Sequence, residues 1–203
     1  MRIERNMLSR ILGLAWLALM LSSCASTKMT SSWRLPETGP LEFEKVMALV
    51  LVQDASVRRV GEDELVRQIQ RAEAIPSYRL VEEQDLKDEA KLREAVESSG
   101  VDAVVVLRPV YDENEITYNS GSYPGPYYSF YGYYGWGYGI SYAPGYYQQD
   151  RLVGVETNVY DVKSGKLVWS GLSQTTNPEG VRKLVADTAK AVRNEMRKYG
   201  FLK

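Results

Sequence analysis

The chain has 203 residues, with 25 Lys and Arg, 26 Asp and Glu, one Cys and no His. Hydrophobic residues make up 44% and charged residues 25%, which is typical of a globular protein of about one domain. Without His, the sequence excludes His-based catalytic triads and the commonest zinc ligand, and a single Cys excludes intrachain disulfides and multi-Cys metal sites. A formal net charge of −1 gives no electrostatic basis for nucleic-acid binding.

The amino terminus has the pattern of an export signal. Arg2, Arg5 and Arg10 give a positive start, and residues 11–21 form an apolar run of 11 residues. A helix that spans a bilayer needs about 20 apolar residues, so this run is too short and fits the apolar region of a secretory signal peptide. We therefore expect residues 1–23 to be a signal peptide.

The signal ends at Leu21-Ser22-Ser23-Cys24, which resembles the lipobox of bacterial lipoproteins. The resemblance implies that Cys24 receives a diacylglycerol thioether and becomes the acylated first residue after cleavage, carrying chains such as palmitate. Two or more acyl chains give stable anchoring, whereas one chain is marginal. The alternative is an ordinary cleaved signal followed by an incidental Cys.

The residues after Cys24 bear on the destination. Ala25 and Ser26 follow it, so the Asp that marks retention in the inner membrane is absent. The same resemblance therefore implies the outer membrane, with a lipid-anchored protein facing the periplasm. Removing residues 1–23, with three Arg and one Glu, leaves 180 residues with 22 basic and 25 acidic side chains, a net of −3.

Residues 24–42 are predicted to be a lipidated flexible tether, because the stretch is rich in Ser, Thr, Pro and Gly and lacks apolar periodicity. Trp33 within it is expected to pack on the domain edge or at the membrane interface. Residues 43–203 are then expected to form a single α/β domain.

The first half of this domain alternates strands and helices. Residues 45–53 and 101–110 are almost unbroken apolar runs, typical of strands buried on both faces of a parallel sheet. Strands that alternate with helices predict right-handed crossovers and a parallel sheet. Between the two runs we expect, in chain order, a helix over 58–74, a strand over 78–81 and a helix over 85–98.

The second half changes pattern. Residues 153–159 and 167–175 alternate apolar and polar side chains around a turn at 163–166, which predicts a β-hairpin. Asn177 is then expected to cap a helix with Pro178 at its first position. The apolar stripe of that helix comprises Val181, Leu184, Val185, Thr188, Ala189, Val192, Met196 and Tyr199. The predicted fold is α/β: a mixed five-stranded sheet built as β-α-β-α-β, then an antiparallel hairpin and a C-terminal helix.

A Tyr/Gly-rich insertion at residues 119–149 separates the halves and contains no charged residue. From Tyr118 to residue 149 the chain holds 11 of its 15 Tyr, and such a long Gly- and Pro-rich loop is usually either functional or disordered. It reads as a flexible low-complexity loop, an adaptable contact surface, or a segment that self-associates. The candidate partner-binding residues are Tyr127, Tyr128, Tyr131, Tyr133, Tyr134, Trp136 and Tyr138.

No catalytic constellation emerges. Glu62, Asp63 and Glu64 are consecutive on a helix and point about 100° apart, so a solvated helix start explains them better than a catalytic pair. Residues 112–115 offer oxygen ligands for calcium but lack the EF-hand pattern, and an acidic strand edge is the simpler interpretation. No Gly-rich phosphate loop follows the first strand, so no cofactor is predicted.

The core order resembles small α/β domains of bacterial envelope lipoproteins, including the amino-terminal domain of the Tol-Pal propeller protein and the curli-secretion channel lipoprotein. The hairpin sequence Val159-Tyr160-Asp161-Val162-Lys163-Ser164-Gly165-Lys166-Leu167-Val168-Trp169-Ser170, after an aromatic-Gly loop, is similar to a family of lipoproteins of unknown function. That family has no agreed activity to transfer. The chain also lacks visible channel-forming hairpins, which disfavours a secretion-pore role.

Two functions of different classes remain open. The first is a non-enzymatic outer-membrane lipoprotein that binds or scaffolds another envelope protein or cell-wall glycan through the Tyr/Gly-rich loop, with the membrane as its anchor and no nucleic acid as a partner. The second is a small-ligand receptor or enzyme that uses a cleft at the carboxyl ends of the parallel strands, near Asp54, Arg58 and Arg108. A deep pocket there favours the second function, and a filled apolar strand end favours the first.

Overall fold

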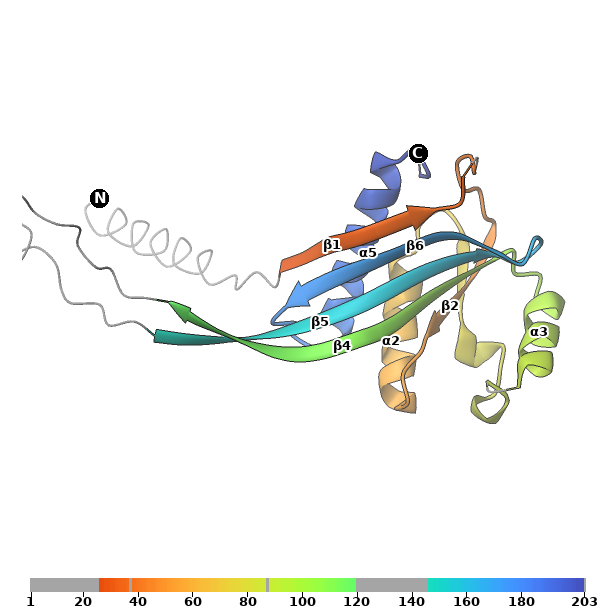
Figure 1. Cartoon of the computed structure of the whole chain (residues 1–203). Helices are drawn as coiled ribbons and strands as arrows, with labels where there is room; N and C mark the ends of the chain where they lie inside the picture. Colours follow the sequence, from red (N-terminus) through yellow and green to blue (C-terminus); the bar gives the residue numbers. More distant parts are fainter. Residues whose placement is uncertain (1–25, 37, 87, 120–145, 203) are drawn as a thin grey trace, which may run out of the picture.

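A mixed β-sheet organises the chain (Figure 1). The computed structural model describes residues 26–36, 38–86, 88–119 and 146–202. The strand order is β1-β6-β5-β4-β2-β3, and the strands are β1 (Ser26–Arg34), β2 (Lys45–Val50), β3 (Glu73–Pro76), β4 (Ala103–Asn119), β5 (Tyr146–Asp161) and β6 (Lys166–Thr176). The helices of the described residues are α2 (Ala55–Gln68), α3 (Glu89–Ser98) and α5 (Val181–Lys198), with short 3-10 turns η1 (Ser77–Arg79) and η2 (Glu83–Asp85).

The predicted α/β class and mixed sheet are confirmed. β2 pairs in parallel with β3 and β4, whereas β4–β5, β5–β6 and β1–β6 are antiparallel. Ala48 and Val50 of β2 pack with residues of α2 and α5, whereas Met47, which precedes Ala48, packs with Val96 of α3. Because successive side chains of a strand point to opposite faces, helices cover both faces of β2, which explains its unbroken apolar run.

The sheet has six strands rather than five, because part of the predicted flexible tether forms β1. Residues Ser26 to Arg34 pair with β6 along the edge of the sheet. Thr27 Oγ1 lies 2.8 Å from Thr175 Oγ1, and Thr30 Oγ1 donates to the carbonyl of Leu172 at 3.0 Å. Cross-strand hydrogen bonds such as these stabilise a polar edge strand. A strand of this kind has no apolar periodicity in its sequence by which it could be predicted. Trp33 is 47% exposed on this strand.

Several element boundaries also differ from those predicted; β4 and β5, for example, extend to Asn119 and from Tyr146. The short strand occupies Glu73–Pro76, because Ser77–Arg79 forms a 3-10 turn. α2 starts at Ala55 and ends at Gln68. Residues 73 and 74, which are predicted to end this helix, belong to β3. Gly180, not Asn177, precedes the first turn of α5, because Asn177 lies at φ 50° and its side chain binds β5 instead. The apolar stripe of α5 is confirmed for Val185, Thr188, Val192 and Met196, which are buried. Tyr199, its predicted last member, follows the helix and is 46% exposed.

Trp169 is the largest fully buried side chain among the described residues, and it folds across Gly171 on the same face of β6. A Cβ at Gly171 would lie 2.3 Å from Trp169 Cη2 and 2.7 Å from Met29 Cε. The glycine is therefore required by the close approach of the buried Trp169 and the partly buried Met29 rather than by its backbone angles.

Gly171→Ala is expected to destabilise the fold by about 1–3 kcal/mol, the usual effect of forcing an extra methyl group into a packed core. Chemical denaturation followed by tryptophan fluorescence measures the change. Gly39→Ala is the matched control, since nothing lies within 4 Å of a Cβ there. Equal stability of the Gly171 and Gly39 variants would contradict the packing described for Trp169.

Candidate functional site

The predicted cleft at the carboxyl ends of the parallel strands is filled. Asp54 Oδ1 accepts a hydrogen bond from the Val57 amide at 2.9 Å and so caps α2. Behind it, Gly61 lies so close to β2 that a Cβ would be 3.3 Å from Val50 Cγ2. This strand end therefore consists of a helix cap and packed apolar atoms.

The two arginines expected in that cleft have local partners. Arg58 is 4% exposed, and its Nη2 lies 3.7 Å from Glu83 Oε2. Arg108 donates from Nε and Nη2 to Glu156 Oε2, at 3.0 and 2.9 Å, across the β4–β5 pair. The structure therefore does not bring Asp54, Arg58 and Arg108 together as one site.

The acidic cluster of α2 has a structural role that the sequence did not reveal. Glu62 is fully buried instead of solvated, and its carboxylate accepts hydrogen bonds from Ser77 Oγ at 2.6 Å and from the amides of Val50 and Tyr78 at 3.2 Å each. Asp63 accepts a hydrogen bond from the Tyr78 hydroxyl at 2.6 Å, and this contact raises the pKa of that phenol above its ordinary value of 10.0. These carboxylates fasten α2 to β2 and η1.

The acidic residues of β4 do not form a metal site. In a strand, neighbouring side chains point to opposite faces, so residues 112–115 cannot converge on one ion. Asp112 instead accepts two hydrogen bonds from Arg151 of β5, at 2.7 and 2.6 Å. Across the described ranges, no cluster of three or more Cys, Asp or Glu residues is arranged to hold a metal.

The Asp112–Arg151 pair gives a pH dependence with a defined sign. Hydrogen bonds from Arg151 lower the pKa of Asp112 below its ordinary value of 3.8. A carboxyl group whose pKa is lower in the folded than in the unfolded protein stabilises the fold while it is ionised. This stabilisation is complete above the unfolded pKa and is lost as the pH falls through the folded pKa. Because both side chains are about half exposed, the pair contributes at most about 1 kcal/mol. Asp112→Asn should be slightly less stable than the parent at pH 7. Urea unfolding should show this difference shrinking as the pH falls below the ordinary carboxyl pKa of 3.8 and vanishing once Asp112 is protonated in the folded state. A constant difference at all pH values would contradict this.

β4 and β5 continue beyond the rest of the sheet as a two-stranded ribbon (Figure 1). The last pair that also adjoins β6 is Glu113–Leu152, since Leu152 pairs with Thr176 at the end of β6. Pairing then continues from Asn114–Arg151 to Asn119–Tyr146. We call these residues, 114–119 and 146–151, the ribbon. Six pairs at about 3.4 Å per residue carry it about 20 Å past the sheet.

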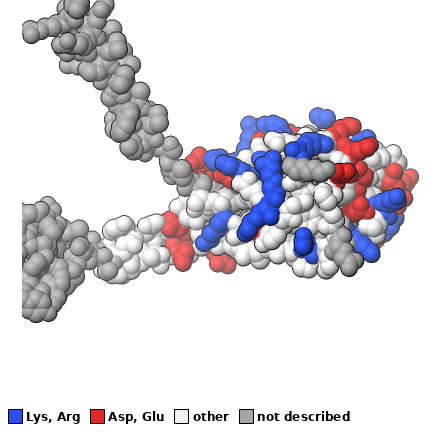
Figure 2. All heavy atoms as spheres, turned by 90° about the horizontal axis from the view of Figure 1, so that it is seen from above, with Lys and Arg blue, Asp and Glu red and all other residues white. Residues whose placement is uncertain are grey.

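The outer part of the ribbon exposes large apolar side chains. Ile116 is 66% exposed, Tyr118 57%, Tyr146 61% and Tyr147 76%. Tyr118 and Tyr147 lie opposite each other with ring centroids 4.9 Å apart. We call residues 116–119 and 146–149 the ribbon tip; it carries no charge, and in Figure 2 it is a narrow white projection with acidic side chains at its base.

The base of the ribbon is braced against the sheet. The Tyr111 ring covers Gly154, where a Cβ would lie 2.2 Å from Tyr111 Cε1, and the Tyr111 hydroxyl lies 3.2 Å from Gln174 Oε1. Asn177 accepts a hydrogen bond from the Arg151 amide and donates one to Asp150, at 2.8 and 2.7 Å. The ribbon is therefore held in register where it leaves the sheet.

The predicted functional residues lie outside the described residues. They are Cys24 and the partner-binding set Tyr127, Tyr128, Tyr131, Tyr133, Tyr134, Trp136 and Tyr138. The ribbon tip includes both ends of that insertion, because residue 119 belongs to β4 and residues 146–149 to β5 instead of to a loop. Its four exposed apolar residues were not singled out from the sequence. The available signal was the strand-forming composition of Ile116-Thr117-Tyr118 and Tyr146-Tyr147 at the two ends of the loop. None of the helices that the structure describes is apolar over a length that could cross a bilayer.

A cavity of about 480 Å³ lies at the other end of the parallel strands. Its walls come from the start of β2, from β4 and β5, and from the carboxyl-terminal halves of α2 and α5. The lining is mostly aliphatic and includes Leu65, Leu107, Val159, Val192 and Met196. Thr157 is 2% exposed, and within the described part of the chain its hydroxyl has no hydrogen-bond partner. Arg193 is held at the cavity by a 2.5 Å hydrogen bond to the Gln68 carbonyl.

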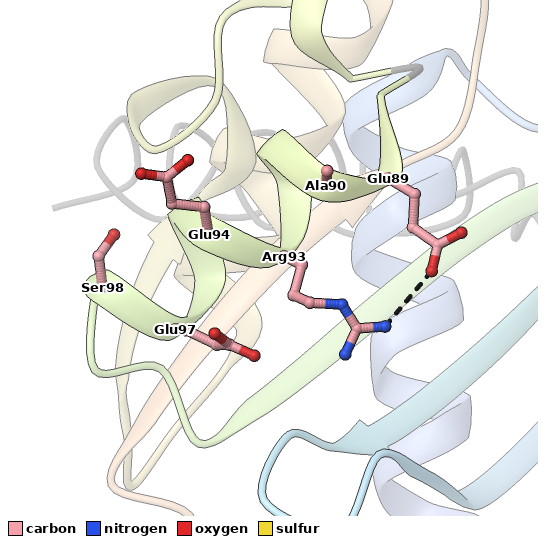
Figure 3. Close-up of a pocket in the computed structure, with 6 residues that line it drawn as sticks. All are labelled: Glu89, Ala90, Arg93, Glu94, Glu97 and Ser98. Atoms are coloured by element: carbon pink, nitrogen blue, oxygen red, sulfur yellow. Dashed lines mark hydrogen bonds and ion pairs between the residues drawn. The ribbon is translucent and has the colours of Figure 1, made fainter.

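A second hollow, along α3, has no convergent groups (Figure 3). All of its lining residues belong to this one helix: Glu89, Ala90, Arg93, Glu94, Glu97 and Ser98. Arg93 Nη2 lies 3.3 Å from Glu89 Oε1, one turn away, which is an ordinary ion pair of an exposed helix face. We do not regard this surface as a site.

No family model and no curated protein sequence matches the chain. Among solved structures, a PelC dodecamer from Paraburkholderia phytofirmans is 16% identical with a TM-score of 0.37, and the match covers 83% of this chain and 95% of that one. Lipoprotein GNA1162 from Neisseria meningitidis is 14% identical with a TM-score of 0.40, covering 76% of this chain and 99% of that one. Both TM-scores are below 0.5, so the proposals that follow use only the residues of this chain.

Proposed function

We propose that this protein is a lipid-anchored lipoprotein of the bacterial envelope that acts as a non-enzymatic binding or scaffolding module. Cys24 carries the lipid, and the residues that follow it direct the protein to the periplasmic face of the outer membrane. The ribbon, together with the remainder of the Tyr/Gly-rich insertion between its two strands, is the contact surface. The sequence from Leu21 to Ser26 supports the anchor and the destination.

The observation that carries the proposed contact role is the exposure of the ribbon tip. Four large apolar side chains are more than half exposed on a ribbon that no other described strand covers. Tyrosines supply large amphipathic contact area at a small cost in side-chain entropy, which suits a binding surface. Exposed apolar surface on a projecting element is also a common mark of an interaction site.

The absence of enzymatic activity is also part of the proposal. It is supported by the partners found for three of the candidate side chains: Asp54 caps a helix, Glu62 holds backbone amides, and Arg108 pairs with Glu156. These contacts occupy the groups that acid–base chemistry would need to have free and convergent.

The contact surface is tested by site-specific photo-crosslinking in intact envelopes. A benzophenone amino acid at Tyr147 should give crosslinks to a specific envelope component, whereas the same group at Lys163, in the exposed turn between β5 and β6, should give none. Identical crosslinking patterns from the two positions would refute the ribbon as the contact surface.

A matched variant separates the ribbon from the insertion. Replacing residues 120–145 by Asn-Gly, a turn suited to a two-residue hairpin, closes the ribbon after Asn119. If the Tyr147 crosslinks persist in this variant, the ribbon tip alone is sufficient. If they disappear while the protein unfolds cooperatively, the insertion supplies the contact.

A second function is favoured by the cavity. Its volume of 480 Å³ lies in the range of small-molecule pockets, about 300–1,000 Å³. The buried Thr157 hydroxyl could form a hydrogen bond with one polar group of a ligand that is aliphatic elsewhere. A receptor for a small apolar ligand would thus use the amino ends of the parallel strands rather than the carboxyl ends predicted. Native mass spectrometry of the full chain should then show a bound apolar molecule that Ala189→Phe removes and Asn194→Phe, on an exposed position of the same helix, does not.

A further inference from the structure

The ribbon and the start of β1 lie at the same end of the molecule. Ser26 pairs with Thr176, Thr176 pairs with Leu152, and Leu152 pairs with Glu113, so these four residues mark one level across the sheet. Figure 1 shows β4 and β5 extending past this level on the side where β1 begins. Anything attached just before β1 is therefore close to the ribbon.

Covalent geometry then limits how far the lipid site can be from the sheet. Cys24 is two residues before Ser26, and a residue spans at most about 3.6 Å, so their Cα atoms are within about 7 Å. The ribbon extends about 20 Å beyond the same level. The ribbon therefore reaches further in this direction than Cys24 can, so a membrane that approaches this end of the domain meets the ribbon first.

The chemistry of the ribbon changes along its length. Charged residues surround the point where the ribbon leaves the sheet. They are Asp112, Glu113, Glu115, Asp150 and Arg151, and we call them the charged collar. The ribbon tip beyond the collar has no charge and exposes Ile116 and three tyrosines. Aromatic side chains with one polar end prefer the headgroup level of a bilayer, whereas charged side chains stay in water.

The open edges of the ribbon limit its depth. Beyond Leu152 neither β4 nor β5 pairs with a third described strand. Asn177 bonds the backbone amide and carbonyl of Arg151, and the outward backbone groups nearer the tip need water or headgroups as partners. Unpaired backbone groups are not tolerated in the hydrocarbon core. The headgroup region supplies hydrogen-bonding partners and an environment suited to tyrosine.

We propose that the ribbon tip is a second membrane contact, seated in the headgroup region of the leaflet that holds the lipid on Cys24. The partner is the bilayer surface itself, and the charged collar marks the water side of the contact. This inference rests on the proposed lipid anchor and names the partner of the proposed contact surface. It also fixes the orientation of the domain, with the β5–β6 turn facing away from the membrane.

The test uses the full lipidated chain in vesicles of phosphatidylethanolamine and phosphatidylglycerol. Since Cys24 is the one native Cys and carries the lipid, a Cys introduced elsewhere is the sole free thiol for an NBD fluorophore. Tyr147→Cys and Ile116→Cys place the label on the ribbon tip, at exposed positions where the fold is not at risk. Lys163→Cys places it at the exposed far turn as the matched control.

In vesicles, labels at 147 and 116 should show a blue shift of emission and loss of quenching by aqueous iodide, and nitroxides near the headgroups should quench them more than nitroxides deep in the chains. The label at 163 should stay fully quenched by iodide. Iodide quenching at 147 and 116 equal to that at 163 would overturn the proposal, as would stronger quenching by the deep nitroxides.

Failure of this inference is distinguishable from failure of the proposed function. The mass of the purified chain reports directly whether Cys24 carries lipid. If it does and the ribbon labels remain aqueous, the membrane contact is wrong, while crosslinks from Tyr147 to an envelope protein would still support a binding module with a protein partner.

Discussion

Glu62→Ala is expected to lower the free energy of unfolding by about 3 kcal/mol or more, because it leaves three hydrogen-bond donors without their acceptor. The carboxylate is fully buried and accepts three hydrogen bonds, from the Val50 amide, the Tyr78 amide and the Ser77 hydroxyl. Alanine leaves all three donors without this acceptor, and each buried donor left unpaired costs about 1–3 kcal/mol. Urea unfolding followed by circular dichroism measures the loss.

Two controls separate this network from a general effect of removing charge. Glu89→Ala removes a carboxylate whose side chain is 88% exposed and should change stability by less than about 0.5 kcal/mol. Glu62→Gln keeps one carbonyl oxygen and should fall between the parent and Glu62→Ala. A Glu62→Ala protein as stable as Glu89→Ala would mean that the carboxylate does not fasten α2 to β2 and η1.

Cys24→Ser is expected to move most of the protein from the membrane fraction to the soluble fraction of the envelope. The serine hydroxyl cannot carry the thioether-linked lipid, and each methylene group withdrawn from the bilayer removes about 0.8 kcal/mol of binding. The ribbon tip alone offers only four large apolar side chains, so it should retain a small bound fraction. Fractionation with immunoblotting measures the distribution.

The residual bound fraction provides a further comparison. In the Cys24→Ser background, Tyr147→Ser should reduce it, whereas Lys163→Ser should not. Retention of Cys24→Ser at the parent level would show that lipid on this residue is not the anchor, and the signal would then be an ordinary cleaved one followed by an incidental Cys.

The sequence predicts the parts of the fold whose periodicity is dictated by their own burial. The apolar run of β2 is buried on both faces, and the stripe of α5 packs on the sheet as its spacing requires. β1 could not be predicted in this way, because its residues are polar and half of its ladder is contributed by β6, more than 130 residues later. The composition of residues 26–34 indicates that they are exposed, but it does not indicate that they pair with β6.

The candidate site was harder to predict for the same physical reason. Glu62 looks like a solvated helix residue in sequence, and only the approach of Ser77 and Tyr78 gives its carboxylate partners. The acidic residues of β4 look like a potential ion site until Arg151, on the opposite strand, pairs with Asp112. The uncharged, aromatic character of the insertion is evident in the sequence. The ribbon is not, because it forms only when Asn114–Asn119 pair with Tyr146–Arg151.

The antiparallel pairing of β1 with β6 has a mechanical consequence. Tension applied at the amino terminus acts on Ser26 along the axis of β1, while the inter-strand hydrogen bonds run perpendicular to it. The hydrogen bonds along the whole strand then share this load in shear. They do not open one after another, as they would if the strand were pulled away sideways. Drag on the domain therefore meets resistance from the entire β1–β6 ladder, and β1 bears the force that is applied on the amino-terminal side of Ser26.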